Sequence, residues 1–498
     1  MKLAAALAAI VLMASAASAE TVAIESGPLS GTTANGVDVY RGIPYAAPPV
    51  GALRWAPPAP PARWTTPRDA SSFGAICPQP QRSDGGVAMG AGQTQSENCL
   101  FLNVFAPHGA KHLPVMVWIH GGAHRFGSGS GAIYDGTNFA KDGVILVSIN
   151  YRLGLLGYFA HPALTKAAGA NAPLGNYGQM DQIAALQWVR RNIAAFGGDP
   201  GNVTVFGESA GGSSILYLLA TPSAKGLFAK AIVESGGGWF NPATLASKEA
   251  EGVDFANKNG RSGADATLEQ LRAIPVDKTL DIPANLGFGP FVDGRLVPQS
   301  PTRAFADGTA TDVPLIIGSN SFEASLMQSF NIPPDRIIGK LPPAARQIYA
   351  SDASDDTTLA HAVFTDSVMG APAHWVAARE AGGAPSWLYH FSYVASMQRA
   401  RVPGARHGSE IPYVFSTGDA LASRFGISLS PDDTAMESRM HACWVAFAKT
   451  GKPECGGQPW PAYTPANDTL MEFGPTTGPV SGFRKAQYDA LESVLRPN

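Results

Sequence analysis

The sequence has little excess charge of either sign. Charged residues make up 15% of the 498 residues, and the formal net charge is −3. No run of lysine and arginine stands out, so the chain lacks the basic patch that a nucleic-acid or anionic membrane partner requires. Hydrophobic residues make up 45%, which predicts a large buried core and excludes an intrinsically disordered chain.

Internal repeats and pure Gly/Ser or Pro linkers are also missing. The 55 glycines and 40 prolines are scattered without a period, which excludes collagen-like and low-complexity chains. Because no linker divides the chain, we expect one domain over residues 20–498 that carries insertions. The stretches Ser83–Gly92 and Gly236–Asp265 are expected to be long surface loops and caps.

Long apolar runs are confined to the N-terminus. Lys2 precedes the apolar stretch Leu3–Ala16, and Ala17-Ser18-Ala19 has the small residues of a cleavage site before Glu20. The stretch is shorter than the ~20 residues that a membrane span needs. We therefore predict a cleaved signal peptide over residues 1–19, and a secreted or periplasmic protein without stable membrane insertion.

Cysteine is scarce, and none of the four cysteines has the spacing of metal ligands, so no metal or other cofactor is predicted. In an oxidising compartment four cysteines allow three disulfide pairings. Cys77 with Cys99 and Cys443 with Cys455 are neighbours in sequence, which favours these two pairs. Buried free thiols are the alternative, and the state of Cys443 and Cys455 stays open.

Short apolar runs rich in Val and Ile alternate with helical patterns. The helix expected at about Gln179–Phe196 places Ile183, Leu186, Val189 and Ile193 on one face. The alternation predicts an α/β fold, with a mostly parallel, doubly wound sheet and helices on both faces. The expected buried strands are Val115–His120, Val144–Asn150, Val203–Phe206, Ala231–Ser235, Val313–Gly318 and Trp387–Tyr393.

The strongest local motif is Gly207-Glu208-Ser209-Ala210-Gly211, which lies between an expected strand and an expected helix. G-x-S-x-G in that context is typical of a sharp turn that exposes a nucleophilic serine. Side chains two residues before and after the serine would collide, which explains the two glycines. Ser209 is therefore the candidate nucleophile, and the N–H of Ala210 is a candidate oxyanion donor at a helix N-terminus.

A second motif, His120-Gly121-Gly122-Ala123, follows the expected strand that ends near His120. Acyl transfer creates an oxyanion whose hydrogen-bond donors must be in place before the charge develops. Small residues let backbone N–H groups approach that oxygen. We expect Gly122 and Ala123 to donate together with Ala210.

These motifs and several others resemble the type B carboxylesterases, the cholinesterase-like branch of the α/β-hydrolases. The resemblance covers nearly the whole mature chain. It implies an α/β-hydrolase fold, a Cys77–Cys99 disulfide, and two ion pairs, Arg54–Glu97 and Arg152–Asp181. The other matching stretches are Arg41–Tyr45, Pro48–Gly51, Ser96–Asn103, Asn150–Gly154, Gly175–Gly178 and Phe196–Pro200.

The sequence departs from the family pattern at three places. Asn98 stands where the family often has Asp, and Ala123-His124 stands where many members have Gly then Phe. The alanine keeps its N–H donor. His124 is expected to place an ionisable ring at the wall of the pocket.

The acid and base should follow the serine, because this fold orders its triad as Ser, acid, His. Glu323 lies just beyond an expected strand and matches the family's acid, while Asp293 is the runner-up and has the pattern of a turn residue. His407 follows the last expected strand and matches the family's histidine segment. His390 lies inside a strand and His441 on a helix, so both are expected to be structural.

The resemblance implies a serine carboxylesterase that forms an acyl-enzyme on Ser209, with a small-molecule ester as its substrate. Glu208 is expected to add negative potential beside the serine, and Ser235 to support the acid. Trp239 and Phe240 are candidates for the acyl pocket, with exposed loop aromatics or core packing as the alternatives.

Other functions stay open from the sequence. Activity on amides, carbamates or thioesters would need the same groups. A lipase would need a lid; no amphipathic lid is obvious, but Met327–Ile332 or the long loops could contain one. A catalytically dead adhesion module should have lost part of the triad, and this chain has kept it. The sequence does not indicate an oligomeric state.

Overall fold

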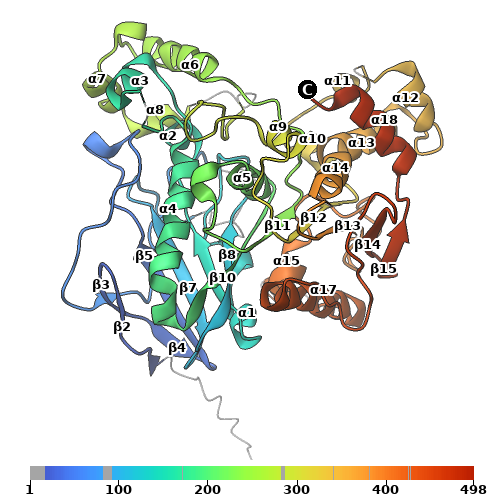
Figure 1. The fold of residues 1–498 in the computed structure, drawn as a ribbon, viewed down its shortest axis with the longest axis horizontal. Helices are drawn as coiled ribbons and strands as arrows, with labels where there is room; N and C mark the ends of the chain where they lie inside the picture. Colours follow the sequence, from blue (N-terminus) through green and yellow to red (C-terminus); the bar gives the residue numbers. More distant parts are fainter. Residues whose placement is uncertain are drawn as a thin grey trace, which may run out of the picture.

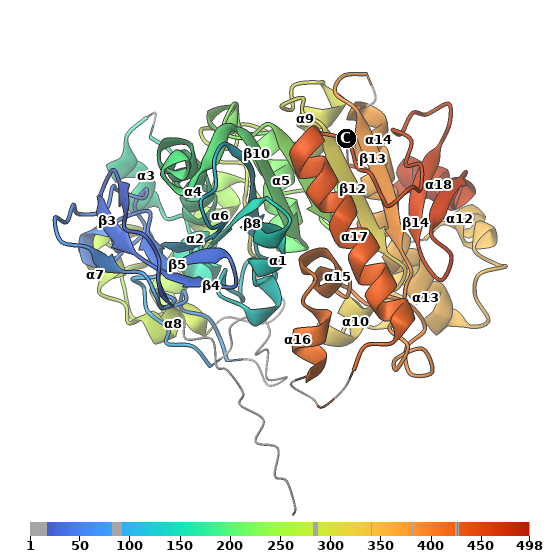
Figure 2. The ribbon, with the colours of Figure 1, turned by 90° about the horizontal axis from the view of Figure 1, so that it is seen from below.

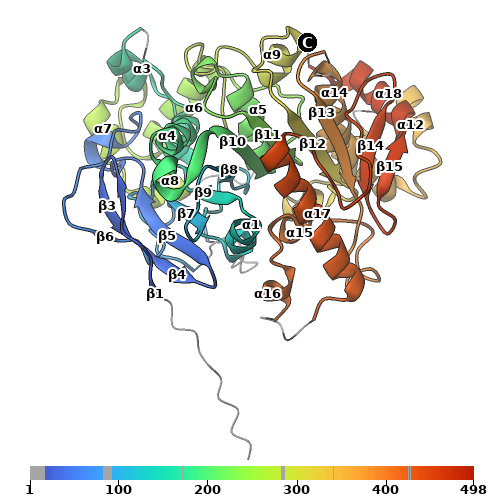
Figure 3. The same cartoon turned by 60° about the horizontal axis from the view of Figure 1, so that its bottom comes forward.

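A computed structural model gives the fold, and it describes residues 17–81, 92–170, 172–281, 287–339, 341–380, 382–423, 426 and 428–497. In this part of the chain, one 12-stranded sheet runs across the whole molecule, from the N-terminal strands at one edge to the C-terminal strands at the other (Figures 1 and 3). In order across the sheet, the strands are β1 (Ala17–Ser18), β4 (Thr32–Ala34), β5 (Val37–Pro44), β7 (Phe101–Pro107), β9 (Ile145–Ile149), β8 (Leu113–Ile119), β10 (Gly198–Glu208), β11 (Lys230–Glu234), β12 (Leu315–Asn320), β13 (Ser386–Phe391), β14 (Thr469–Phe473) and β15 (Gly478–Ser481).

The centre of the sheet is parallel and its edges are antiparallel. Strands β9, β8, β10, β11, β12, β13 and β14 pair in parallel, and the strands outside them pair antiparallel. A second, small sheet contains β2 (Val22–Ile24), β3 (Gly27–Ser30) and β6 (Arg68–Asp69). The predicted α/β-hydrolase architecture, mostly parallel and doubly wound, is confirmed.

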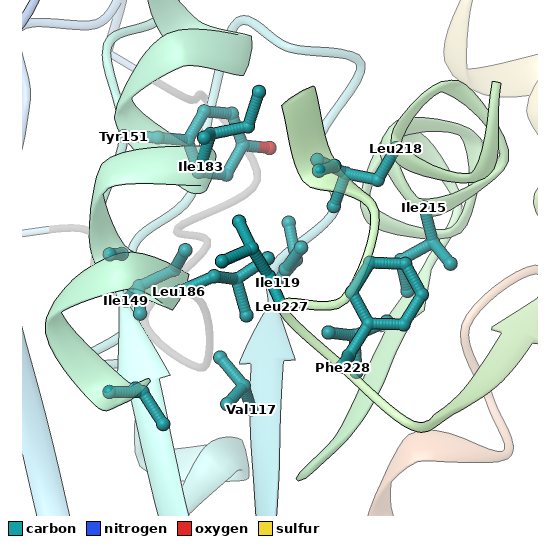
Figure 4. Packing of buried hydrophobic residues seen from close by; sticks show 14 of the residues in the cluster. Val117, Ile119, Ile149, Tyr151, Ile183, Leu186, Ile215, Leu218, Leu227 and Phe228 are labelled. Atoms are coloured by element: carbon teal, nitrogen blue, oxygen red, sulfur yellow. The ribbon is translucent and has the colours of Figure 1, made fainter. Parts of the chain in front are cut away.

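Side chains alternate between the two faces of the central strands, and both faces are covered by helices. Val117 and Ile119 of β8 lie on the face covered by α4 (Tyr177–Asn192) and α5 (Ala210–Leu219), and belong to one apolar cluster with Ile183, Leu186 and Ile215, all labelled in Figure 4. α14 (Ala371–Glu380) covers the same face farther along the sheet.

Met116 and Trp118 point to the opposite face. There they meet α1 (Thr137–Lys141), α15 (Ile411–Phe415) and α17 (Pro431–Thr450), the long helix that crosses the sheet in Figure 2. The central strands are therefore buried on both sides, which accounts for their nearly continuous apolar sequences.

A third apolar cluster lies beside the main sheet, among insertions near the C-terminal half. It contains α10 (Ser325–Ser329), α11 (Pro334–Ile338), α12 (Pro343–Ile348), α13 (Asp356–Thr365) and α18 (Lys485–Leu495). The remaining helices lie in other connections: α2 (Gly154–Gly157), α3 (Pro162–Ala168), α6 (Leu245–Lys258), α7 (Leu268–Arg272), α8 (Val276–Leu280), α9 (Pro301–Ala306) and α16 (Gly418–Ser423).

All six expected strands exist, with shifted bounds. β10 begins at Gly198 rather than Val203, because the polar residues before Val203 continue the strand without an apolar signal. The expected helix at Gln179–Phe196 is α4 followed by a short 3₁₀ turn, Ile193–Phe196.

One prediction about the insertions was wrong. The expected loop at Gly236–Asp265 contains the helix α6, whose start is capped by the Thr244 hydroxyl accepting from the N–H of Ser247. The other expected loop, Ser83–Gly92, falls outside the described residues except for Gly92.

No helix among the described residues is long and apolar enough to span a bilayer. Residues 1–16 of the predicted signal peptide lie outside the described residues. The cleavage site itself stays a prediction.

The strand order determines where the site forms. β8, β10, β11 and β12 are neighbours and run parallel, so the segments after their carboxyl ends meet at one edge of the sheet. Those segments carry the His120–Ala123 turn, Ser209, Ser235 and Glu323.

Candidate active site

Ser209 occupies the sharp turn between β10 and α5. Its φ of 57° and ψ of −122° place a non-glycine residue in strained backbone geometry, which clusters at functional sites. The turn is fixed by its own backbone, since the N–H of Ser209 donates to the carbonyl of Glu234 at 2.8 Å. The hydroxyl is thereby held at the carboxyl edge of the sheet.

Gly207 and Gly211, on the two sides of Ser209, are required because neither position has space for a side chain. A Cβ on Gly207 would lie 2.5 Å from the Ile119 carbonyl oxygen and 2.9 Å from the carbonyl carbon of Gly211. A Cβ on Gly211 would lie 1.9 Å from the same Ile119 oxygen. The steric reason expected for the two glycines is confirmed.

The His120–Ala123 turn lies directly against the serine. A Cβ on Gly121 would lie 3.1 Å from Cβ of Ser209 and 2.6 Å from Oε2 of Glu208. Gly122, Ala123 and His124 all have positive φ, of 102°, 56° and 53°. The first N–H groups of α5 begin at Ala210 and lack intrahelical partners. The candidate oxyanion donors therefore come from two turns that contact each other: Gly122 and Ala123 from the His120–Ala123 turn, and Ala210 from the turn at Ser209.

The candidate acid and base lie together on the other side. Nδ1 of His407 is 2.5 Å from Oε2 of Glu323, and the Glu323 side chain is fully buried. Oε1 of Glu323 accepts from the Ser235 hydroxyl at 2.6 Å and from the N–H of Asn320 at 2.7 Å. The acid is therefore oriented by three groups, one of which is the predicted supporting serine.

The loops that carry the acid and base are tied to each other. The N–H of His407 donates to the Ser325 hydroxyl at 3.0 Å, and the N–H of Phe322 donates to the Ala405 carbonyl at 2.8 Å. These bonds join residues that are more than eighty positions apart in the sequence, so the geometry of the pair depends on the fold.

The rejected acid and histidines have structural roles. Asp293 accepts from the N–H groups of Arg295 and Val297, which makes it a turn residue. His390 is buried on β13, with its ring 4.5 Å from that of Phe483. His441 pairs its Nδ1 with the Val414 carbonyl at 2.7 Å.

A group of buried glutamates surrounds the base, and sequence reasoning found only part of it. Nε2 of His407 lies 3.0 Å from Oε1 of Glu208, and no hydrogen bond joins Ser209 to His407 in the described structure. Glu410 is fully buried and accepts from the Asn320 side chain. Glu234 is also fully buried and accepts from Nε1 of Trp444 at 2.7 Å.

Glu234 and Glu410 had weak signals in the sequence. A carboxylate in the apolar strand β11 is out of place unless it is paired or neutral. Glu234 on β11 is paired in register with Glu208 on the neighbouring strand β10, so the two side chains lie on the same face of the sheet. Only the sheet register reveals that proximity.

Burial raises the pKa of all three glutamates near the base. The pKa of Glu208 is raised, that of Glu234 is raised to about 8, and that of Glu410 is raised well above its usual range. Burial lowers the pKa of His407, but the facing carboxylates of Glu208 and Glu323 outweigh this effect and raise it. The site thus disfavours several negative charges at once and favours a positive imidazolium. A protonated Glu208 would lessen that preference and leave more of His407 neutral, the form that can accept a proton.

The expectation for His124 was wrong. Its side chain is buried, Nε2 lies 2.9 Å from the Ser214 hydroxyl, and burial lowers its pKa to about 4. The ring packs against Tyr158, with centroids 5.1 Å apart. A cavity lies beside the oxyanion turn and is lined by Ala123, but the His124 side chain is not part of its described lining. The turn at Ala123–His124 directs it into the protein, where a neutral ring is stable.

Of the two candidates for the acyl pocket, Trp239 lines this cavity, whereas Phe240 packs against Tyr217. Of the candidate lid, Met327 is buried in the third apolar cluster, and Ile332 forms part of the cavity wall. In the described part of the chain, no cluster of three His, Cys, Asp or Glu side chains could hold a metal ion.

Comparison with known proteins places this geometry in a family. The model of the carboxylesterase family matches residues 18–345 and 339–491. The para-nitrobenzyl esterase of Bacillus subtilis is 37% identical over 471 residues, which cover 89% of this chain and 92% of that protein. The chain belongs to the carboxylesterase family. It is therefore a serine ester hydrolase.

Other relatives of this carboxylesterase agree. The fumonisin B1 esterase of Sphingopyxis macrogoltabida is 36% identical, over 92% of this chain and 87% of that protein. A solved PNB esterase superposes with a TM-score of 0.84 at 33% identity, over 95% of this chain and 99% of the other. A carboxylesterase of Geobacillus stearothermophilus superposes with a TM-score of 0.82 at 34% identity, with the same coverage.

The structural pairs that the resemblance implied are present in this carboxylesterase. Arg54 pairs with Glu97 at 2.6 Å, and Arg152 with Asp181 at 2.7 Å. Cys77 is joined to Cys99, with their Cα atoms 4.9 Å apart. Cys443 is joined to Cys455, which answers the pairing left open by the sequence.

Proposed function

We propose that the protein is an exported serine carboxylesterase whose triad is Ser209, His407 and Glu323. The observation that carries the proposal is the buried Glu323–His407 pair, whose Nδ1–Oε2 distance is 2.5 Å, on the same sheet edge as the strained Ser209 turn. Such a pair orients an imidazole and stabilises its cation during acyl transfer.

In this mechanism, Ser209 Oγ attacks the ester carbonyl while His407 Nε2 accepts the hydroxyl proton. The bond from carbon to the alcohol oxygen then breaks, and His407 returns the proton to the leaving alcohol. Water attacks the acyl-enzyme with His407 again as base, which releases the acid and restores the Ser209 hydroxyl. Hydrogen bonds in the triad commonly shorten when substrate binds, so the Ser209–His407 contact is expected to form in the complex.

The N–H groups of Gly122, Ala123 and Ala210 are proposed to hold the oxyanion. What supports this is the contact between the Gly121 turn and Ser209, and the position of Ala210 at the start of α5. Ser235 is proposed to position Glu323. Glu208 is proposed to modulate the charge on His407 across the 3.0 Å separation of their side chains.

The choice between ester and amide substrates is tested with p-nitrophenyl acetate and p-nitroacetanilide, which share an acetyl group. We expect hydrolysis of the ester, and a loss of about 10³-fold or more in kcat in Ser209→Ala. Turnover of the anilide alone, or equal turnover of the ester by Ser209→Ala, would contradict the proposal.

For domain organisation we propose a signal peptide over residues 1–19 and one catalytic domain over residues 20–498. Two disulfides support an oxidising destination. The family match starts at residue 18, within two residues of the proposed boundary. N-terminal sequencing of the protein recovered outside the cytoplasm should begin at Glu20. Recovery of only uncleaved protein in the cytoplasm would reject this part.

A further inference from the structure

A cavity of about 840 Å³ opens beside the candidate oxyanion turn. Ala123 and Trp239 form one part of its wall. Phe288 forms a second part, and the segment from the end of α10 into α11 forms a third. Because Ala123 belongs to the turn that contacts Ser209, a ligand that extends from this cavity past Ala123 would approach the proposed nucleophile.

The wall is mostly apolar, including two side chains that are unusually exposed. Phe330 at the end of α10 keeps 45% of its surface exposed, and Val368 in the π-helical turn Asp366–Gly370 keeps 36%. Large apolar side chains exposed in a concave wall are typical of a binding site for an apolar ligand. The body of the ligand should therefore be apolar.

The charged side chains in the described lining are both arginines. Arg125 is buried, two residues beyond the oxyanion turn, and its guanidinium lies over the Phe288 ring at 5.5 Å. Arg336 on α11 is exposed, and its side chain makes no ion pair or hydrogen bond with any described residue. No carboxylate belongs to the described lining.

The exposed guanidinium of Arg336, in an apolar wall whose described lining has no carboxylate, favours an anionic group on the ligand. A guanidinium binds a carboxylate through two parallel N–H donors, which adds both energy and orientation. A cationic ligand would meet repulsion from the same wall, and a neutral ligand would leave the Arg336 guanidinium without a charged partner among the described residues.

We propose that this cavity binds esters with an apolar body that also carry a carboxylate, and that Arg336 is the main residue contacting that carboxylate. The inference rests on the proposed ester hydrolysis and names the substrate class for it. Arg336 is thus a specificity-determining residue outside the triad and the oxyanion turn.

The test compares 4-acetoxybenzoate with its neutral isostere 4-acetoxybenzamide, with each kcat/KM divided by the rate of hydroxide-catalysed hydrolysis. The series extends to 4-acetoxyphenylacetate and 3-(4-acetoxyphenyl)propionate with their amides, which vary the reach of the carboxylate. We expect at least one carboxylate ester to be preferred over its amide by about tenfold, as for one charge-assisted hydrogen bond.

Arg336→Gln should remove most of that preference while leaving kcat/KM for the amides within about twofold. Arg336→Lys should retain part of it, because charge remains but the paired donors are lost. The control is Arg190→Gln, which removes an exposed arginine from α4 and should leave the preference unchanged. The preference should also weaken at high ionic strength.

Two results would overturn the inference. If the wild type shows no preference for any carboxylate ester, or if Arg336→Gln lowers kcat/KM equally for acids and amides, the cavity proposal is wrong while ester hydrolysis stands. If neither the acids nor the amides are hydrolysed, the proposed function fails first and the substrate class falls with it.

Discussion

Replacing Glu234 by Gln should stabilise the protein in mildly alkaline solution and change little in acid. Glu234 is fully buried, and burial raises its pKa from 4.5 to about 8. A carboxyl whose pKa is raised on folding binds a proton more tightly in the folded state. Its contribution to stability is therefore present below pH 4.5 and is lost as the pH rises toward 8.

The size of this loss in folding stability follows from the difference between the folded and unfolded pKa of Glu234. Each pH unit between the two pKa values costs up to about 1.4 kcal/mol, so the accumulated loss near pH 8 is roughly 4 kcal/mol. Gln resembles the protonated acid, does not titrate, and keeps an oxygen that can accept from Trp444 Nε1, as Glu234 does. With ~2.1 cal/mol/K of unfolding entropy per residue, roughly 1 kcal/mol corresponds to about 1 °C for a chain of this length.

The measurement is urea and thermal unfolding of the wild type and Glu234→Gln at pH 5.5 and 8.5. The variant should gain stability over the wild type on going to pH 8.5, by up to about 4 °C in Tm. Glu454→Gln, in an exposed loop, is the matched control and should show no such gain. A constant difference at both pH values, or a less stable variant at pH 8.5, would show that Glu234 is ionised in the folded protein.

The remaining predictions concern the candidate triad and the covalent frame. Glu323→Gln should lower kcat far more than Asp293→Asn, because of these two carboxylates only Glu323 contacts His407; a dead Asp293 variant beside an active Glu323 variant would reassign the acid. Ser235→Ala should lower kcat with KM little changed, since only the orientation of the acid is affected; wild-type kinetics would remove Ser235 from the site. Opening the Cys77–Cys99 loop, of 22 residues' separation, should cost roughly 3 kcal/mol of stability; unchanged urea unfolding of a double Cys→Ser variant would refute this.

Much of the fold could be predicted from the sequence. The parallel strands are buried on both faces, so their apolar runs are nearly continuous and stand out. The bounds could not be read equally well, since β10 starts in the polar segment at Gly198, where pairing rather than burial defines the strand. The helix α6 was missed because its buried residues are few and its start depends on a local threonine cap.

The candidate triad was predictable because order, motif and strand context agreed on Ser209, Glu323 and His407. The surrounding charges were not. Glu234 and Glu410 approach the base only through sheet register and loop packing, which have no local signature. His124 was misplaced for a related reason, because its positive φ directs the ring away from the cavity.

The central claim is that Ser209 is the nucleophile activated by His407. The most direct measurement is labelling of the folded protein with a fluorophosphonate, followed by intact mass and peptide mapping, in the wild type, Ser209→Ala and His407→Gln. We expect one adduct per chain, located on Ser209, absent from the Ser209 variant and greatly slowed in the His407 variant. An adduct on another residue, or equal labelling of Ser209→Ala, would contradict it.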